Sequence, residues 1–171
     1  MSIEPTGRRE TRGFGEAVVF DRRITANIEE VWASITESDR LQRWIGVWEG
    51  DPGSGGVVFR MTAEGDDVAP EAVTIHECAA PRTLRMRIGG RDDEADAGEL
   101  ELTLGEAGGT TILTFAQSAA SDHPVADVAP GWEYYLDRLV AVQDGGDPAS
   151  VNFADYYPVM REHYRAMFEE G

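Results

Sequence analysis

The sequence predicts a single α+β domain with an antiparallel sheet, two short helices near the N-terminus and a long helix near the C-terminus. The middle of the chain holds short runs rich in β-branched and apolar residues, separated by turn-rich or charged segments. Apolar residues in 28–35 follow helical spacing, and a longer helical pattern ends at Gly145-Gly146. A chain of 171 residues suits one domain with a full core.

Strands are expected in six segments, which would make a sheet of about six strands. The runs "LRMRI" and "LELTL" alternate apolar with polar residues. One sheet face is therefore buried and the other is exposed to solvent, which indicates antiparallel pairing. The predicted strands are residues 16–24, 57–61, 72–78, 83–88, 99–104 and 110–118.

Two short helices follow the first predicted strand. Asn27 is a suitable N-cap and Glu30 stands three residues later, as in a capping box. One helical face then carries Ile28, Val31, Trp32 and Ile35. The second helix begins with Ser38 or Asp39 as its cap and ends near Trp44.

The long helix contains the unusual stretch "APGWEYYLDRL", in which two helix breakers precede a good helical pattern. With Asp127 as N-cap, Pro130 falls in the first turn, where its missing N–H costs little. We expect Gly131 to let the helix backbone approach a neighbour and Trp132 to close the end of the core.

The chain divides into three parts. Residues 1–13 are polar and are expected to form a flexible arm, and residues 14–146 form the domain. Residues 147–171 predict a further helix capped by Asp155, packing on the domain or on a partner subunit. The apolar stripe of this extension, which this chain's own core, a second subunit or a partner must cover, comprises Tyr157, Met160, Tyr164, Met167 and Phe168.

Composition excludes several functions. The net charge of −17 argues against nucleic acid, where Lys and Arg must replace counterions, and against anionic membranes. All 15 basic residues are Arg, so Schiff-base catalysis by a lysine is excluded. No apolar run approaches the ~20 residues that span a bilayer, and none follows Arg8-Arg9 as in a signal peptide. We therefore expect a cytoplasmic protein.

Candidate metal ligands are scarce. Cys78 is the only cysteine, which rules out an intramolecular disulfide and a zinc site made of cysteines. The three histidines, His76, His123 and His163, are dispersed along the chain, so no metal site and no cofactor are expected.

The order of strand, two short helices, five strands and long helix resembles the helix-grip fold of the START-like superfamily. In that fold a curved antiparallel sheet wraps the long C-terminal helix. Within the SRPBCC group, the chain is similar to the branch related to the C-terminal domain of the activator of Hsp90 ATPase. The resemblance covers about residues 14–146 and is carried by "ITANIEEVWASITESDRLQRWI", Gly55-Gly56 before a strand, Glu77-x-x-x-Pro81-x-x-Leu84, "GGTTILTF" and "GWEYYLDRL".

The resemblance implies a cavity between the sheet and the long helix. Alternation places Val57 with Phe59 and Met61, Leu84 with Met86 and Ile88, and Leu113 with Phe115 and Gln117 on one face of each strand. An apolar pocket with few polar groups is the usual form of a small-molecule site. Its predicted lining is Trp44, Phe59, Met61, Met86, Leu113, Phe115, Gln117, Trp132, Tyr135 and Leu136. The same residues would alternatively fill a dry core.

Three hypotheses of function remain open. The first is binding of a small apolar or aromatic molecule without an identified reaction, which needs a cavity of roughly 300 Å³ or more. The second is an Hsp90 co-chaperone-like interaction module, and the third is an enzyme like the polyketide cyclases and aromatases.

Catalytic candidates are weak, so we assign no catalytic residue and favour a protein that is not an enzyme. Many relatives carry His where this chain has Gln117, and the strand phase leaves it open whether His76 faces the cavity. Four further charged residues are expected to face water: Arg85, Arg87, Asp137 and Arg138.

Overall fold

The computed structural model describes residues 3–62, 70–88, 98–119 and 124–169. Within these ranges an eight-stranded sheet has the order β1-β2-β8-β7-β6-β5-β4-β3, and all neighbouring strands are antiparallel. The strands are β1 (Arg8–Arg12), β2 (Gly15–Ile24), β3 (Val47–Glu49), β4 (Gly56–Arg60), β5 (Glu71–Ala79), β6 (Thr83–Ile88), β7 (Gly98–Ala107) and β8 (Thr110–Ser118). The helices are α1 (Ile28–Thr36), α2 (Ser38–Leu41), α3 (Val125–Gln143) and α4 (Arg161–Glu169).

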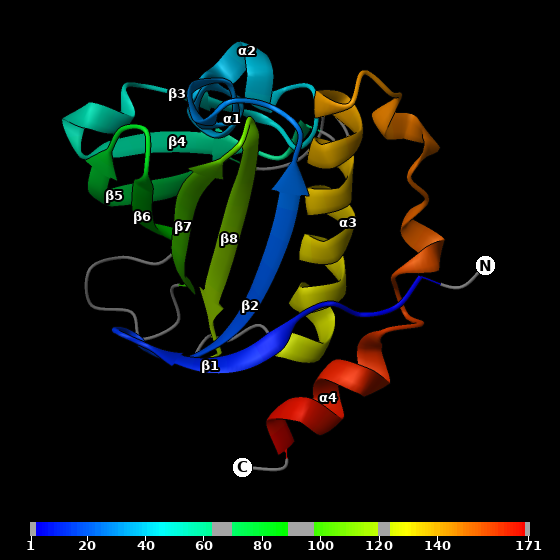
Figure 1. Cartoon of the computed structure of the whole chain (residues 1–171). Coiled ribbons are helices and arrows are strands. Elements are labelled where there is room, and N and C mark those ends of the chain that lie inside the picture. The colour runs from blue at the N-terminus through cyan, green and yellow to red at the C-terminus, as the bar shows by residue number, and fades with distance from the viewer. Residues whose placement is uncertain (1–2, 63–69, 89–97, 120–123, 170–171) are drawn as a thin grey trace.

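The sheet curves around α3, which lies along its concave side (Figure 1). The helices α1 and α2 cover one end of the same side, and the large core cluster fills the space between these layers. This arrangement is the helix-grip fold, so the predicted α+β class and architecture are confirmed.

The six predicted strands all form, and two further strands were not predicted. The segment "RRETR" forms β1 along β2, so the expectation of a flexible arm over residues 1–13 was wrong for this part. All five residues of this strand are polar or charged, so the segment has no apolar alternation that would indicate a strand. The other, β3, has only three residues and pairs with β4 at the opposite edge.

The two short helices begin close to where the sequence indicates. Asn27 Oδ1 accepts a hydrogen bond from the Glu30 backbone N–H at 2.9 Å and thus caps α1 as expected. Ser38 has a different role from the predicted cap, because its hydroxyl contacts the backbone O and N of Trp48 at 3.0 and 3.2 Å. This pair of contacts joins α2 to β3.

The start of α3 differs from the prediction. The helix begins at Val125 after Pro124, so Asp127 lies in its first turn instead of capping it, and Pro130 lies in the second turn. A Cβ atom at Gly131 would meet no described atom within 4 Å outside the helix's own backbone, so the expected close approach there was wrong. Trp132 does pack against the core, as expected.

The segment after α3 runs alongside that helix, on the side away from the central strands (Figure 1). Its buried side chains are Tyr156, Met160 and Tyr164. Asp155 does not cap a helix, since it ends a short 3₁₀ turn and α4 begins only at Arg161.

Among the described helices, none is long and apolar enough to cross a bilayer.

Candidate functional site

A cavity of about 50 Å³ lies between the sheet, α3 and the α1–α2 pair. Every strand from β3 to β8 contributes at least one side chain to it, and the polar surface is almost nil. The lining consists of Ile35, Leu41, Trp44, Ile45, Trp48, Phe59, Val73, Met86, Ile88, Leu100, Leu102, Phe115 and Trp132.

Three tryptophans and two phenylalanines give the cavity its aromatic character. The indole N–H groups of Trp44 and Trp48 donate to the backbone oxygens of Ser34 and Thr36 at 2.9 and 3.0 Å. Because these polar groups are satisfied by α1, both rings are held with their apolar surface available to the cavity. The remaining tryptophan, on α3, has its ring centroid 4.4 Å from that of Phe115 on β8.

The cavity is partly open to solvent. Two lining side chains, Ile88 and Trp132, are only half-buried, while the other lining side chains are buried. Ile88 is the last residue of β6, and Trp132 lies in the third turn of α3. These two residues therefore mark the rim, by which we mean the place where the cavity meets solvent.

The structure places half of the predicted lining residues around the cavity. Trp44, Phe59, Met86, Phe115 and Trp132 contact it. The others lie outside the lining: Met61, directly after β4, is half-buried, and the remaining four are buried, namely Leu113, Gln117, Tyr135 and Leu136.

Several lining residues were missed by the sequence prediction. Leu100 and Leu102 belong to the alternating run of β7, so their strand and face could have been deduced from the pattern. Trp48 lies on the unpredicted strand β3, and Ile35 belongs to the predicted apolar stripe of α1. Leu41, Ile45 and Val73 were also missed, and Ile88 was placed on the same strand face as Met86 but not in the predicted lining.

The two histidines that the structure describes, His76 and His163, do not line the cavity. A register shift in β5 between Ile75 and Glu77 leaves His76 exposed, with its Nε2 3.3 Å from Glu99 Oε2. His163 is exposed on α4, and His123 lies outside the described residues. Within the described part of the chain, no three His, Cys, Asp or Glu side chains gather as a metal site.

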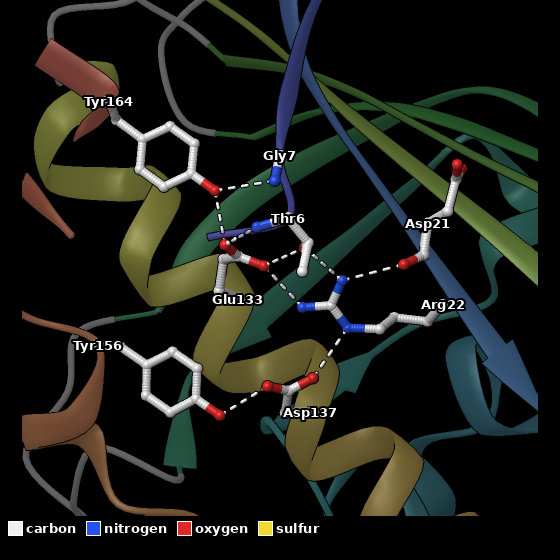
Figure 2. A network of polar contacts seen from close by, with 8 residues as sticks. All are labelled: Thr6, Gly7, Asp21, Arg22, Glu133, Asp137, Tyr156 and Tyr164. Carbon is white, nitrogen blue, oxygen red and sulfur yellow. Dashed lines mark hydrogen bonds and ion pairs between the residues drawn. The ribbon is translucent and has the colours of Figure 1, made fainter. Parts of the chain in front are cut away.

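A buried polar network that the sequence analysis did not predict lies on another side of α3 (Figure 2). Its centre is Glu133, which is 1% exposed. One carboxylate oxygen accepts from Arg22 Nη2 at 2.8 Å and from the Thr6 hydroxyl. The other accepts from the Thr6 backbone N–H at 2.7 Å and from the Tyr164 hydroxyl at 2.6 Å.

Asp137, one turn further along α3, extends this network and does not simply face water as predicted. It accepts from Arg22 Nε at 2.9 Å and from the Tyr156 hydroxyl at 2.6 Å. Burial opposes the charge of Arg22, but the carboxylates of Asp137 and Glu133 outweigh it and hold the pKa of Arg22 above its ordinary value. The network therefore fixes the N-terminal segment, β2 and the C-terminal segment to one helix.

Arg138, which was predicted to face water, also contacts other parts of the protein. Its Nε donates to the Trp44 backbone oxygen at 2.9 Å, and its guanidinium lies over the ring of Tyr134. Because Trp44 lines the cavity, this bond links α3 to the cavity wall.

The fold and the apolar cavity define a helix-grip protein of the START-like superfamily. Residues 25–144 match the family model described as activator of Hsp90 ATPase homolog 1-like protein. This match covers most of the chain, so the chain belongs to that family, as its motifs indicate. A search of curated proteins finds no match.

Several solved structures share the fold, two of them over nearly the whole chain. The crystal structure of CalU16 from Micromonospora echinospora is 25% identical, with a TM-score of 0.72 over 96% of both chains. A conserved protein of unknown function from Enterococcus faecalis is 20% identical, with a TM-score of 0.71 over 96% of this chain and 91% of its own. DynU16, from the dynemicin biosynthetic locus, is 20% identical, with a TM-score of 0.56 over 77% of this chain and 48% of its own.

Proposed function

We propose that this protein binds a small apolar or aromatic molecule in the cavity between the sheet and α3. The observation that carries the proposal is the cavity's lining of apolar side chains alone, rich in aromatic rings, with a half-buried rim at Ile88 and Trp132. Burial of apolar ligand surface against such walls favours binding by roughly 25 cal/mol for each Å² removed from water.

The volume limits the ligand. About 50 Å³ is well below the roughly 300 Å³ of sites that hold drug-sized molecules. A single ring or a short alkyl chain is the expected occupant, and a larger molecule requires lining side chains to move. Met86 and Trp132 are the side chains we expect to move, because methionine adapts its shape readily and Trp132 is half-buried.

The proposal contains no chemical step. The lining includes no acid, base or nucleophile, and His76 lies on the exposed side of β5. An enzyme of the cyclase type would need such a group in contact with the substrate. The neighbour from a biosynthetic locus is nevertheless a reason to include aromatic biosynthetic intermediates among the compounds tested.

The test is a thermal-shift screen with single-ring and two-ring aromatic compounds and short alkyl chains. A ligand at a hundred times its Kd stabilises the protein by about 2.7 kcal/mol, which raises Tm by about 5–11 °C for a chain of this size. A saturable shift supports the proposal. If no compound in the set shifts Tm, the proposal is contradicted. Co-precipitation with Hsp90 would then test the interaction hypothesis.

A cavity-filling variant makes the test specific. Leu100→Phe places a ring in the cavity, so it should abolish the ligand-induced shift while the protein stays folded. The matched control is Leu104→Phe, on the same strand and buried at 5% exposure but outside the lining. It should lower stability by about 1–3 kcal/mol through overpacking and retain the shift. Loss of the shift in both variants, or in neither, would contradict the location of the site.

A further inference from the structure

Gln117 is the polar residue of the sheet's concave face that the proposed cavity leaves unexplained. It lies two residues after Phe115 on β8 and so projects from the same face of the strand. Its side chain is buried, with 8% of the residue exposed. Its Oε1 atom is fully covered and has no hydrogen-bond partner among the described residues.

The amide of Gln117 lies next to the rim. On the neighbouring strand β7, the residue paired with Gln117 is Leu100, which lines the cavity. A Cβ atom at Gly98 would lie 3.4 Å from Gln117 Nε2, so the bare glycine leaves room for the amide group. Gly98 is in turn paired with Ile88, the rim residue of β6.

An unpartnered buried acceptor lowers stability, because the desolvated oxygen loses its bond to water and gains nothing in return. A leucine or methionine would fill the same position without that cost. An acceptor kept beside an apolar cavity is instead the usual arrangement of a small-molecule site, in which a few polar groups orient the ligand.

We infer that Gln117 Oε1 accepts a hydrogen bond from the ligand, and that the ligand is an aromatic molecule with one hydroxyl or N–H donor. Its ring occupies the apolar cavity, and its donor reaches Oε1, which is covered and lies outside the lining of the empty cavity, when the half-buried side chains of the rim move aside. This inference rests on the proposed function and adds the chemical class of the ligand to it. A site that hydrogen-bonds a substrate hydroxyl rejects the analogue that lacks it, since the protein group is then left unpaired.

The test compares two probes of nearly equal size, 4-ethylphenol and 4-ethyltoluene, titrated into the full chain by NMR or calorimetry. The methyl group is the more hydrophobic, so an apolar cavity alone favours 4-ethyltoluene. We expect the unaltered protein to bind 4-ethylphenol at least tenfold more tightly. Gln117→Leu should reverse this preference and raise Tm without ligand, because it removes the unpartnered oxygen.

The control is Gln42→Leu, which changes an exposed glutamine and should leave the preference for 4-ethylphenol intact. Equal binding of both probes, or a preference for 4-ethyltoluene in the unaltered protein, overturns the role of Gln117 while the proposed function stands. An unchanged preference in Gln117→Leu, with a lowered Tm, would overturn it as well and assign Gln117 a structural partner such as a buried water. Failure of both probes and of the wider screen would contradict the proposed function itself.

Discussion

Arg22 Nη2 lies 2.8 Å from Glu133 Oε1, and the two side chains are separated by 111 residues in the chain. Arg22 comes from β2, and Glu133 comes from the middle of α3. Both are buried, at 8% and 1% exposure. Because the guanidinium also contacts Thr6 and Asp137, a single arginine connects three separate parts of the chain: the N-terminal segment, β2 and α3 (Figure 2).

Replacing this arginine should destabilise the protein strongly. Arg22→Met leaves the buried carboxylate of Glu133 and the half-buried carboxylate of Asp137 without their cation. Loss of one member of a buried ion pair costs about 3–5 kcal/mol. We expect a fall of that size in the free energy of unfolding, measured in urea.

The matched control for this variant is Arg161→Met. Arg161 Nε lies 2.8 Å from Asp127 Oδ1, but both side chains are substantially exposed, so water replaces the lost partner. The control should retain nearly all of its stability. Equal losses in the two variants would show that burial of the Arg22 network adds nothing.

Tyr164 links stability to alkaline pH. Burial raises the pKa of the Tyr164 phenol, and the hydrogen bond to Glu133 raises it further. The pKa of Tyr156 is raised in the same way, by burial and by the hydrogen bond to Asp137. A raised folded-state pKa contributes stability that is fully present below the unfolded value near 10 and is lost at higher pH. Above about pH 10 the unfolding free energy should therefore fall by up to about 1.4 kcal/mol per pH unit for each tyrosine.

The variant Tyr164→Phe isolates that effect. It should cost about 1–3 kcal/mol at pH 7, because Glu133 loses one donor, and it should flatten the fall in stability above pH 10. Urea unfolding at pH 7 and at several values up to pH 11 gives both quantities. An unchanged alkaline slope would show that this phenol ionises equally in the folded and unfolded states.

Removal of residues 147–171 should expose apolar surface and cause aggregation. The removed segment carries Tyr156, Met160 and Tyr164, each 2% exposed or less, and α3 would lose the cover that they provide. The two tyrosines also donate to Asp137 and Glu133, so the deletion leaves buried carboxylates short of partners. Light scattering after gel filtration is the measurement, and a soluble truncated protein of equal stability would refute the prediction.

The sequence predicted the strands of the sheet well because alternation is a local property. Residues 83–88 and 110–118 form strands with those bounds, because the alternation of apolar and polar residues within each run marks a buried and a more exposed face. The strand β1 escaped detection because "RRETR" has no buried face and is held by pairing with β2, a partner that local pattern does not reveal. This edge strand is held by backbone pairing and by ion pairs such as Arg8–Asp21 and Arg9–Glu16, and neither depends on an apolar pattern.

The candidate site was predictable only in part, for a related reason. Alternation shows which face of β8 carries Phe115, but not whether the side chains opposite it leave a gap. That gap depends on the sizes of side chains from nine elements that meet in space. Glu133 was missed because nothing near it in sequence signals burial, and its partner Arg22 is distant in the chain.

Replacement by alanine should change stability in opposite directions at two glycines. Gly131 lies inside α3 with no described neighbour near its missing Cβ, so Gly131→Ala should stabilise the protein by about 1 kcal/mol through helix propensity. At Gly46 a Cβ would collide with the backbone of Arg60 and Met61, which cannot rotate away. Gly46→Ala should therefore destabilise, by about 1–3 kcal/mol as for an overpacked core. Thermal unfolding of the two variants side by side measures both, and a loss of stability in Gly131→Ala would show that α3 needs this glycine for a reason other than space.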